Sequence, residues 1–118
     1  METQYIYRLG EFTGSCLLEL RVGTDTAVPK FSRADSLYIL DDAFYQVLEP
    51  LFRLVVQDFD MFEDTVIDKF QWKKIRELDI EAYVKADFVQ ETAGMLAEID
   101  QWVTAHIPDG GAFLVIGI

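Results

Sequence analysis

The sequence predicts an α+β domain in which an N-terminal β-hairpin and a buried C-terminal strand form one sheet packed against two or three helices. Three observations lead to this prediction. Apolar residues alternate in two N-terminal segments, they recur at helical spacing through the middle of the chain, and the last seven residues carry no polar side chain. A chain of 118 residues is expected to form a single domain over residues 1–118.

The two alternating segments, residues 5–9 and 16–22, flank a loop that contains glycine. Period-two alternation on both sides of such a loop is typical of a β-hairpin. Cys16 falls on the apolar side of the second segment, so we expect it to be a small core residue. Residues 23–33 contain Pro29 and several small polar residues, which predicts an exposed loop.

A first helix is predicted after residues 36–40, which suit either a short strand or the first turn of that helix. Asp41 or Asp42 is placed to cap it, because a carboxylate accepts hydrogen bonds from the free amides of the first turn. The apolar residues that follow are spaced by three and four up to Val55. Pro50 interrupts this pattern, and we expect a kink or a break near residues 45–49.

Two further helices are predicted. Asp68 and Gln71 have the spacing of a capping box, which starts a helix over about residues 69–78, while residues 80–86 are ambiguous. Asp87 and Gln90 repeat that spacing before the clearest amphipathic pattern. This helix must end at residues 108–111, where proline and glycine cannot continue it.

Three side chains of these helices are candidates for a special role, and in each case we expect a structural one. Trp72 and Trp102 each fall within an apolar helical stripe, so both are expected in the core. His106 is placed at the end of the last helix, where the helix dipole favours a cation.

The final segment, residues 112–118, starts directly after a Gly-Gly turn and is uncharged. Such a run is expected to be a strand buried on both faces in the middle of a sheet.

The composition is strongly acidic. Twenty-one Asp and Glu against ten Lys and Arg give a net charge of −11, which disfavours nucleic acid and anionic membranes and favours basic partners. The four basic residues Lys69, Lys73, Lys74 and Arg76 cluster but are too few for a nucleic-acid surface. With one cysteine and no signal-peptide pattern in residues 1–10, we expect a cytoplasmic protein without an internal disulfide.

Residues for catalysis or for cofactor binding are scarce. One histidine and one cysteine cannot supply a zinc site, and no glycine-rich phosphate loop lies between a strand and a helix. Asp58, Asp60, Glu63 and Asp64 lack the glycine and the terminal glutamate of a calcium loop. We therefore expect no enzyme, no catalytic residue, no cofactor and no metal. Carboxylate acid–base chemistry is the remaining enzymatic alternative, and it requires acids from different segments to converge in a cleft.

The most conspicuous stretch is residues 58–68, which holds five carboxylates and no basic residue among several large apolar side chains. Aromatic residues surrounded by charge are typical of protein interfaces, but they also occur in well-packed loops. For Phe59, Met61 and Phe62 both interpretations stay open. The predicted partner-binding residues are Asp58, Phe59, Asp60, Phe62, Glu63 and Asp64.

A resemblance covers most of residues 37–118. The order of short words is LYILDDAF (37–44), LEPLF (48–52), FDMF (59–62), QWKKI (71–75) and a terminal IGI (116–118). In this layout the chain resembles small bacterial immunity proteins of the contact-dependent growth inhibition kind, which are encoded beside toxins.

The resemblance implies a cytoplasmic protein that binds and neutralises a cognate toxin domain, often a nuclease. The acidic composition is compatible with that role, because nucleases need basic surfaces to hold phosphate. The alternative is a non-enzymatic adaptor or regulatory module that binds a basic protein unrelated to toxins. Both hypotheses place the interface on the acidic stretch, and neither specifies the oligomeric state.

Overall fold

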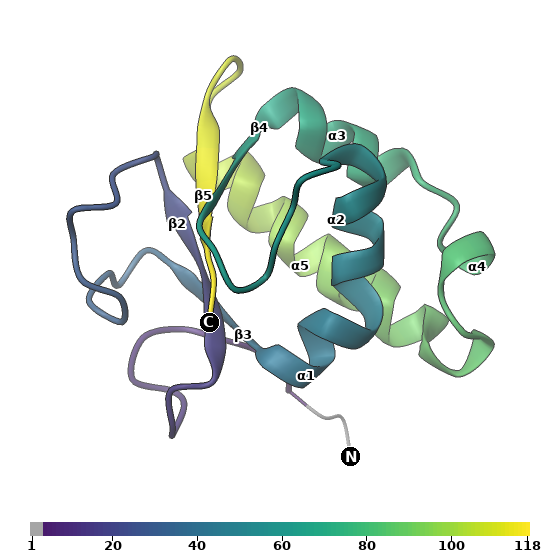
Figure 1. Ribbon diagram of the computed structural model, residues 1–118, viewed down its shortest axis with the longest axis horizontal. Coiled ribbons are helices and arrows are strands. Elements are labelled where there is room, and N and C mark those ends of the chain that lie inside the picture. The colour runs from purple at the N-terminus through teal and green to yellow at the C-terminus, as the bar shows by residue number, and fades with distance from the viewer. Residues whose placement is uncertain (1–3) are drawn as a thin grey trace.

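The computed structural model describes residues 4–118 and shows the predicted α+β fold (Figure 1). Five strands form one antiparallel sheet in the order β1-β3-β2-β5-β4. The helices lie together on one side of this sheet. The elements are β1 (Ile6–Tyr7), β2 (Leu17–Val22), β3 (Leu37–Leu40), α1 (Asp41–Ala43), the π-helical turn η1 (Phe44–Leu48), α2 (Glu49–Val55), β4 (Thr65–Asp68), α3 (Lys69–Glu77), α4 (Ile80–Tyr83), the 3-10 turn η2 (Ala86–Phe88), α5 (Val89–His106) and β5 (Ala112–Ile116).

The predicted N-terminal hairpin is wrong in its pairing, because β3 lies between β1 and β2 and pairs with both. Ile39 of β3 is opposite Ile6 on one side and opposite Leu18 on the other. Leu37, Tyr38 and Ile39 are fully buried, as suits a strand with a neighbour on each side. The two residues of β1 form an edge of the sheet instead.

The first helical segment is continuous but irregular at the place that Pro50 predicts. The amide of Glu49 donates to the carbonyl of Phe44, five residues earlier, in the π-helical turn η1. Pro50 then occupies the first turn of α2, where its missing amide costs little. Neither Asp41 nor Asp42 caps this segment, since the N-cap position belongs to Leu40.

The predicted capping box of α3 is confirmed. Asp68 accepts a hydrogen bond from the amide of Gln71 at 2.7 Å, and the amide of Asp68 donates to the Gln71 side chain at 3.0 Å. The same prediction for α5 is wrong, because η2 precedes the helix and Phe88 stands at its N-cap without a side-chain hydrogen bond. Among residues 4–118 no helix is long and apolar enough to span a bilayer.

β5 confirms the prediction for the C-terminal segment. It pairs antiparallel with β2 on one side and with β4 on the other, and its three middle residues are buried. The main core fills the space between this sheet and the helices. Trp72 and Trp102 are both buried there and contact the ring of Phe113 edge-on.

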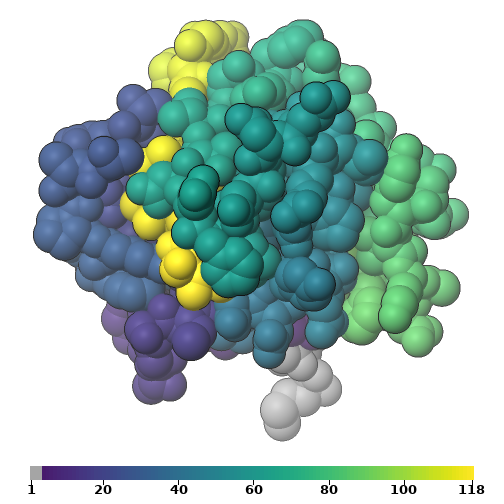
Figure 2. Space-filling model, viewed as in Figure 1, coloured from purple at the N-terminus to yellow at the C-terminus, as the bar shows by residue number. Residues whose placement is uncertain are grey.

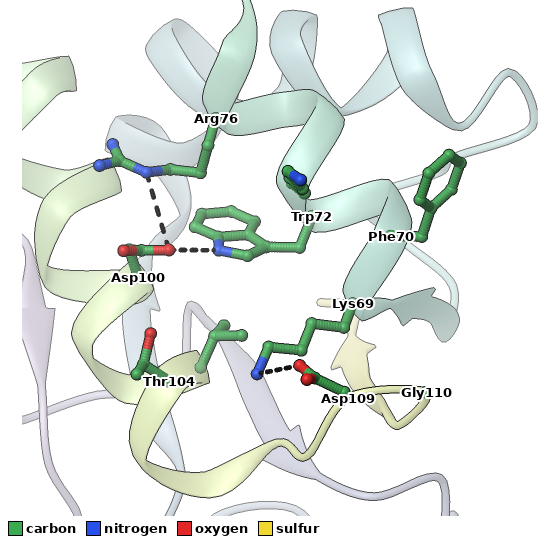
Figure 3. Close-up of a pocket in the computed structure, with 10 residues that line it drawn as sticks. Lys69, Phe70, Trp72, Arg76, Asp100, Thr104, Asp109 and Gly110 are labelled. Atoms are coloured by element: carbon green, nitrogen blue, oxygen red, sulfur yellow. Dashed lines mark hydrogen bonds and ion pairs between the residues drawn. The ribbon is translucent and has the colours of Figure 1, made fainter.

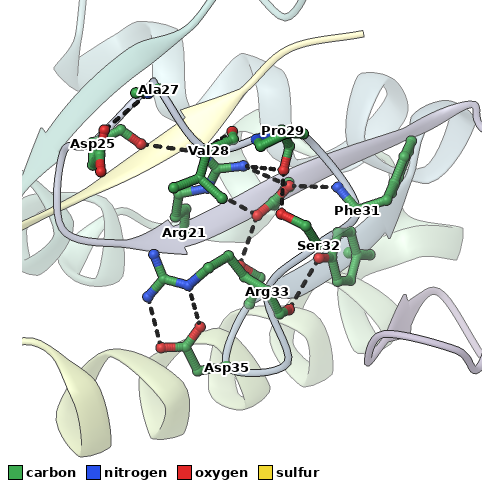
Figure 4. Close-up of polar contacts among 12 residues, drawn as sticks. Arg21, Asp25, Ala27, Val28, Pro29, Phe31, Ser32, Arg33 and Asp35 are labelled. Carbon is green, nitrogen blue, oxygen red and sulfur yellow. Dashed lines mark hydrogen bonds and ion pairs between the residues drawn. The ribbon is translucent and has the colours of Figure 1, made fainter.

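The opposite face of the sheet carries a buried ion pair that the sequence analysis missed (Figure 4). Arg21 donates to both carboxylate oxygens of Glu19, at 3.0 and 3.2 Å, and both side chains are fully buried on β2. The same guanidinium donates to the carbonyls of Asp25, Val28 and Pro29. Residues 23–33 form the predicted loop, in which residues 24–27, 29 and 32 are exposed, and Arg21 holds its backbone against the sheet.

A small aromatic cluster completes this second face. Phe12, Phe31 and Tyr38 have ring centroids 5.0 to 5.6 Å apart. The amide of Phe31 donates to Glu19, and its backbone has a φ of 63°, which the packed ring and this hydrogen bond hold in place. Cys16 is exposed rather than buried, because β2 begins one residue after it.

The loop is fixed at its far end by Arg33 and Asp35. Arg33 donates to both oxygens of the Asp35 carboxylate, and this hydrogen-bonded pairing holds the pKa of Asp35 below its ordinary value. The carbonyl of Asp35 accepts a hydrogen bond from the indole of Trp102 at 2.7 Å. The loop is thus connected to the helical core as well as to β2.

Candidate functional site

The predicted partner-binding stretch forms a loop, residues 57–64, between α2 and β4. Two of its large apolar residues hold it to the core. Phe59 and Met61 are 3% and 4% exposed, and the ring of Phe59 lies 5.4 Å from that of Phe52 and 5.7 Å from that of Phe44. Phe59, predicted as an interface residue, is therefore a core residue, because the loop tucks its ring between the first helical segment and the sheet.

A tight turn in this loop directs Phe62 to the surface. The amide of Phe62 donates to the carboxylate of Asp60 at 2.9 Å, and the amide of Glu63 donates to the Asp60 carbonyl at 3.1 Å. Phe62 is consequently 68% exposed between buried Met61 and exposed Glu63. Asp60 is half-buried and shapes the turn, so its role is structural before any contact with a partner.

The carboxylates of three predicted acids remain on the surface and have no hydrogen bond or ion pair with residues 4–118. Asp58, Glu63 and Asp64 are all exposed. Together with Phe62 they form what we call the acidic surface. In the space-filling view the loop lies beside the C-terminal end of the chain, with residues 23–36 on the other side of that end (Figure 2).

The C-terminal residues contact the backbone of this loop and hold it in place. The amide of Ile118 donates to the carbonyl of Met61 at 2.9 Å. Gly117 allows the close approach, because a Cβ there would lie 2.5 Å from the amide nitrogen of Glu63 and 2.6 Å from its carbonyl oxygen. The conformation of the acidic surface therefore depends on a glycine 54 residues away in the sequence, counted from 63 to 117.

Replacing Gly117 by alanine should move the 57–64 loop. The added methyl group meets backbone atoms that cannot rotate away, so we expect the free energy of unfolding to fall by about 1–3 kcal/mol. Urea unfolding measures the loss. Changed amide chemical shifts of Phe62 and Glu63 measure the displacement, and Gly94→Ala, at a helical site with open space around it, is the control. Unchanged shifts in a Gly117→Ala variant of full stability would contradict this account.

One cation from the loop of residues 23–33 reaches the C-terminal residues beside the acidic surface. Lys30 donates to the carbonyl of Gly117 at 3.0 Å. Its partial burial lowers its pKa, while the nearby carboxylates of Glu19 and Asp64 act in the opposite direction. Lys30 therefore offsets part of the charge at the Asp64 end of the acidic surface.

Two of the grooves formed by residues 4–118 lie elsewhere on the molecule. The first, of about 310 Å³, lies between α3 and α5, where the predicted basic cluster is partly neutralised (Figure 3). Lys69 pairs with Asp109 at 3.3 Å and Arg76 with Asp100 at 3.8 Å. The second, of about 780 Å³, lies between α2 and α4 beside Tyr83. Among the described residues that line them, none belongs to the predicted partner-binding set.

Strand β4 was not expected from the sequence and lies next to the acidic surface. Burial alternates along this strand, with Ile67 in the core and Val66 49% exposed. The run of β-branched residues over 65–67, which favours a strand, was the signal in the sequence, but the neighbouring carboxylates obscured it.

Within the described part of the chain, no group of three or more histidine, cysteine, aspartate or glutamate side chains is arranged to hold a metal ion. Comparison of the chain with models of protein families, with curated proteins and with solved structures gives no significant match.

Proposed function

We propose that this chain is an immunity protein that binds and neutralises a cognate bacterial toxin domain through the acidic surface. The observation that carries the proposal is the exposed ring of Phe62 among the exposed carboxylates of Asp58, Glu63 and Asp64. A protruding aromatic side chain surrounded by charge has the composition of an interface anchor with a polar rim.

The charge of the chain supports a basic partner. A net charge of −11 attracts a basic domain at long range and accelerates the formation of an encounter complex. A nuclease domain, which needs cations to hold phosphate, fits this requirement. Carboxylates on the acidic surface would then occupy the cations that otherwise bind nucleic acid.

The rigidity of the loop also supports a binding role. Phe59 and Met61 fix it to the core, and the hydrogen bond from Ile118 fixes it to the C-terminal end. Little conformational entropy is then lost when Phe62 meets a partner, so more of the contact energy contributes to affinity.

The test is to mix the purified chain with the toxin domain encoded next to it. We expect a stoichiometric complex at micromolar concentration by calorimetry, and loss of the toxic activity in the same mixture. Absence of a complex at that concentration would contradict the proposal. A complex with a basic protein unrelated to any toxin would support the adaptor alternative instead.

A further inference from the structure

The two edges of the sheet are not equivalent, and the hydrogen bonds show which backbone groups each edge exposes. Beyond β4, the amide of Lys69 donates to the carbonyl of Gly111 at 3.0 Å. In an antiparallel ladder, bonded pairs alternate with pairs that are not bonded to each other. Thr65 and Ile67 therefore bond to β5, whereas the amide and the carbonyl of Val66 point away from the sheet.

The opposite edge has the same alternation, which supports the assignment. The amide of Leu40 donates to the carbonyl of Tyr5, so Ile6 of β1 points outward. There the carbonyl of Ile6 accepts a hydrogen bond from the Gln4 side chain at 2.8 Å. On β4 the outward amide of Asp68 likewise donates a hydrogen bond to the side-chain oxygen of Gln71.

Among the described residues, Val66 differs from Ile6 and Asp68 because both its outward amide and its outward carbonyl are free. In residues 4–118 neither its amide nor its carbonyl has a hydrogen-bond partner outside the sheet. Its side chain is 49% exposed, and Asp64 and Asp68, two residues away on each side, are exposed as well. Side chains at this spacing share one face of a strand. The edge thus presents one apolar side chain between two carboxylates, with a free donor and acceptor at its centre.

A second copy of the chain does not suit this edge. Antiparallel pairing about Val66 would place Asp64 of each copy opposite Asp68 of the other. Like charges directly opposite each other destabilise a strand pair. A strand that carries Lys or Arg on each side of an apolar residue would instead oppose both carboxylates and cover Val66.

We propose that β4 is a docking edge, on which an extended segment of a basic protein partner adds a strand to the sheet beside Val66. This inference rests on the proposed function and specifies how the partner is held. Main-chain hydrogen bonds to Val66 contribute affinity, and Asp64 and Asp68 select basic residues at alternate positions. Phe62, 68% exposed just before the strand, extends the contact toward the acidic surface.

The first arm of the test measures hydrogen exchange of single amides, with and without the toxin domain encoded next to the chain. We expect exchange of the Val66 amide to slow by at least about tenfold in the complex, because it gains a hydrogen bond. The amide of Ile6, which points outward at the opposite edge, is the control and should keep its rate.

The second arm uses two variants of the same residue. Val66→Pro removes the free amide without removing a bond to β5, whereas Val66→Thr keeps the amide and the branched side chain. We expect the affinity for the toxin domain to fall by about tenfold in the proline variant and by less than about threefold in the threonine variant. Urea unfolding identifies any loss that comes from the fold itself.

The outcomes separate this inference from the proposed function. A complex that forms with unchanged exchange at Val66 would overturn the docking edge and leave the proposed function standing. The same holds if both Val66 variants, while folded, bind as the natural chain does. Absence of any complex would overturn both.

Discussion

Substitution of Val115 by aspartate should lower the free energy of unfolding by about 4 kcal/mol or more. Val115 is fully buried in β5, opposite Leu20 of β2 on one side and Thr65 of β4 on the other. Among the described residues of the main core, no cation is present to pair with a carboxylate at this position. The expected loss is a large part of the roughly 5–15 kcal/mol that stabilises a typical domain.

Urea unfolding followed by circular dichroism measures this loss. Val66→Asp is the matched control, because it makes the same change on the neighbouring strand at a side chain that is 49% exposed. That variant should lose less than about 1 kcal/mol, as surface substitutions usually do. If Val115→Asp unfolds at the same urea concentration as the natural chain, β5 is not a buried interior strand of this sheet.

Replacement of Arg21 by methionine should have the second largest effect, about 3–5 kcal/mol, because it leaves Glu19 as an unpaired buried charge. Three loop carbonyls lose their donor in the same variant. We therefore expect residues 23–33 to detach from the sheet and to become sensitive to proteolysis before the rest of the chain unfolds. Limited proteolysis and urea unfolding together measure both effects.

The matched control is Arg33→Met. Arg33 pairs with Asp35 at 2.9 Å, but their side chains are 30% and 39% exposed, so this loss should not exceed about 1 kcal/mol. Equal losses in the two variants would mean that the Glu19–Arg21 pair does not hold the loop.

Local rules in the sequence predicted several elements correctly. The capping box at Asp68 depends on a spacing of three residues, and the irregular turn before Pro50 follows from a missing amide. β5 was predicted as a buried central strand because seven consecutive residues lack polar side chains. In each of these cases the physical cause lies within a few residues of the effect.

Long-range pairing could not be predicted in the same way. β3 enters between β1 and β2 because its buried residues need neighbours on both sides, which the alternation of β1 and β2 does not reveal. The buried Glu19–Arg21 pair had a signal, two opposite charges two residues apart on one strand. Its partners, however, lie in a loop whose composition suggests exposure.

The surface exposure of the 57–64 loop was predicted in part. The exposure of Asp58, Phe62, Glu63 and Asp64 in the loop before residue 65 agrees with a partner-facing surface. Phe59 was placed wrongly because a loop offers no periodicity that separates core from surface residues. The support from Gly117 depends on a contact between distant segments, which no local pattern predicts.

We propose that the acidic surface itself, and not the overall charge, binds the basic toxin domain. Two triple variants with the same net charge of −8, from −11 plus 3, separate these possibilities. The first, Asp58→Asn, Glu63→Gln and Asp64→Asn, neutralises the acidic surface. The control, Glu77→Gln, Glu81→Gln and Glu91→Gln, neutralises three exposed acids on α3, α4 and α5.

The most direct measurement is the affinity of each triple variant for the toxin domain at one fixed salt concentration. We expect the acidic-surface variant to bind at least about tenfold more weakly than the natural chain, and the control variant to change by no more than about twofold. Equal weakening in both variants, or none in the first, would contradict binding through the acidic surface.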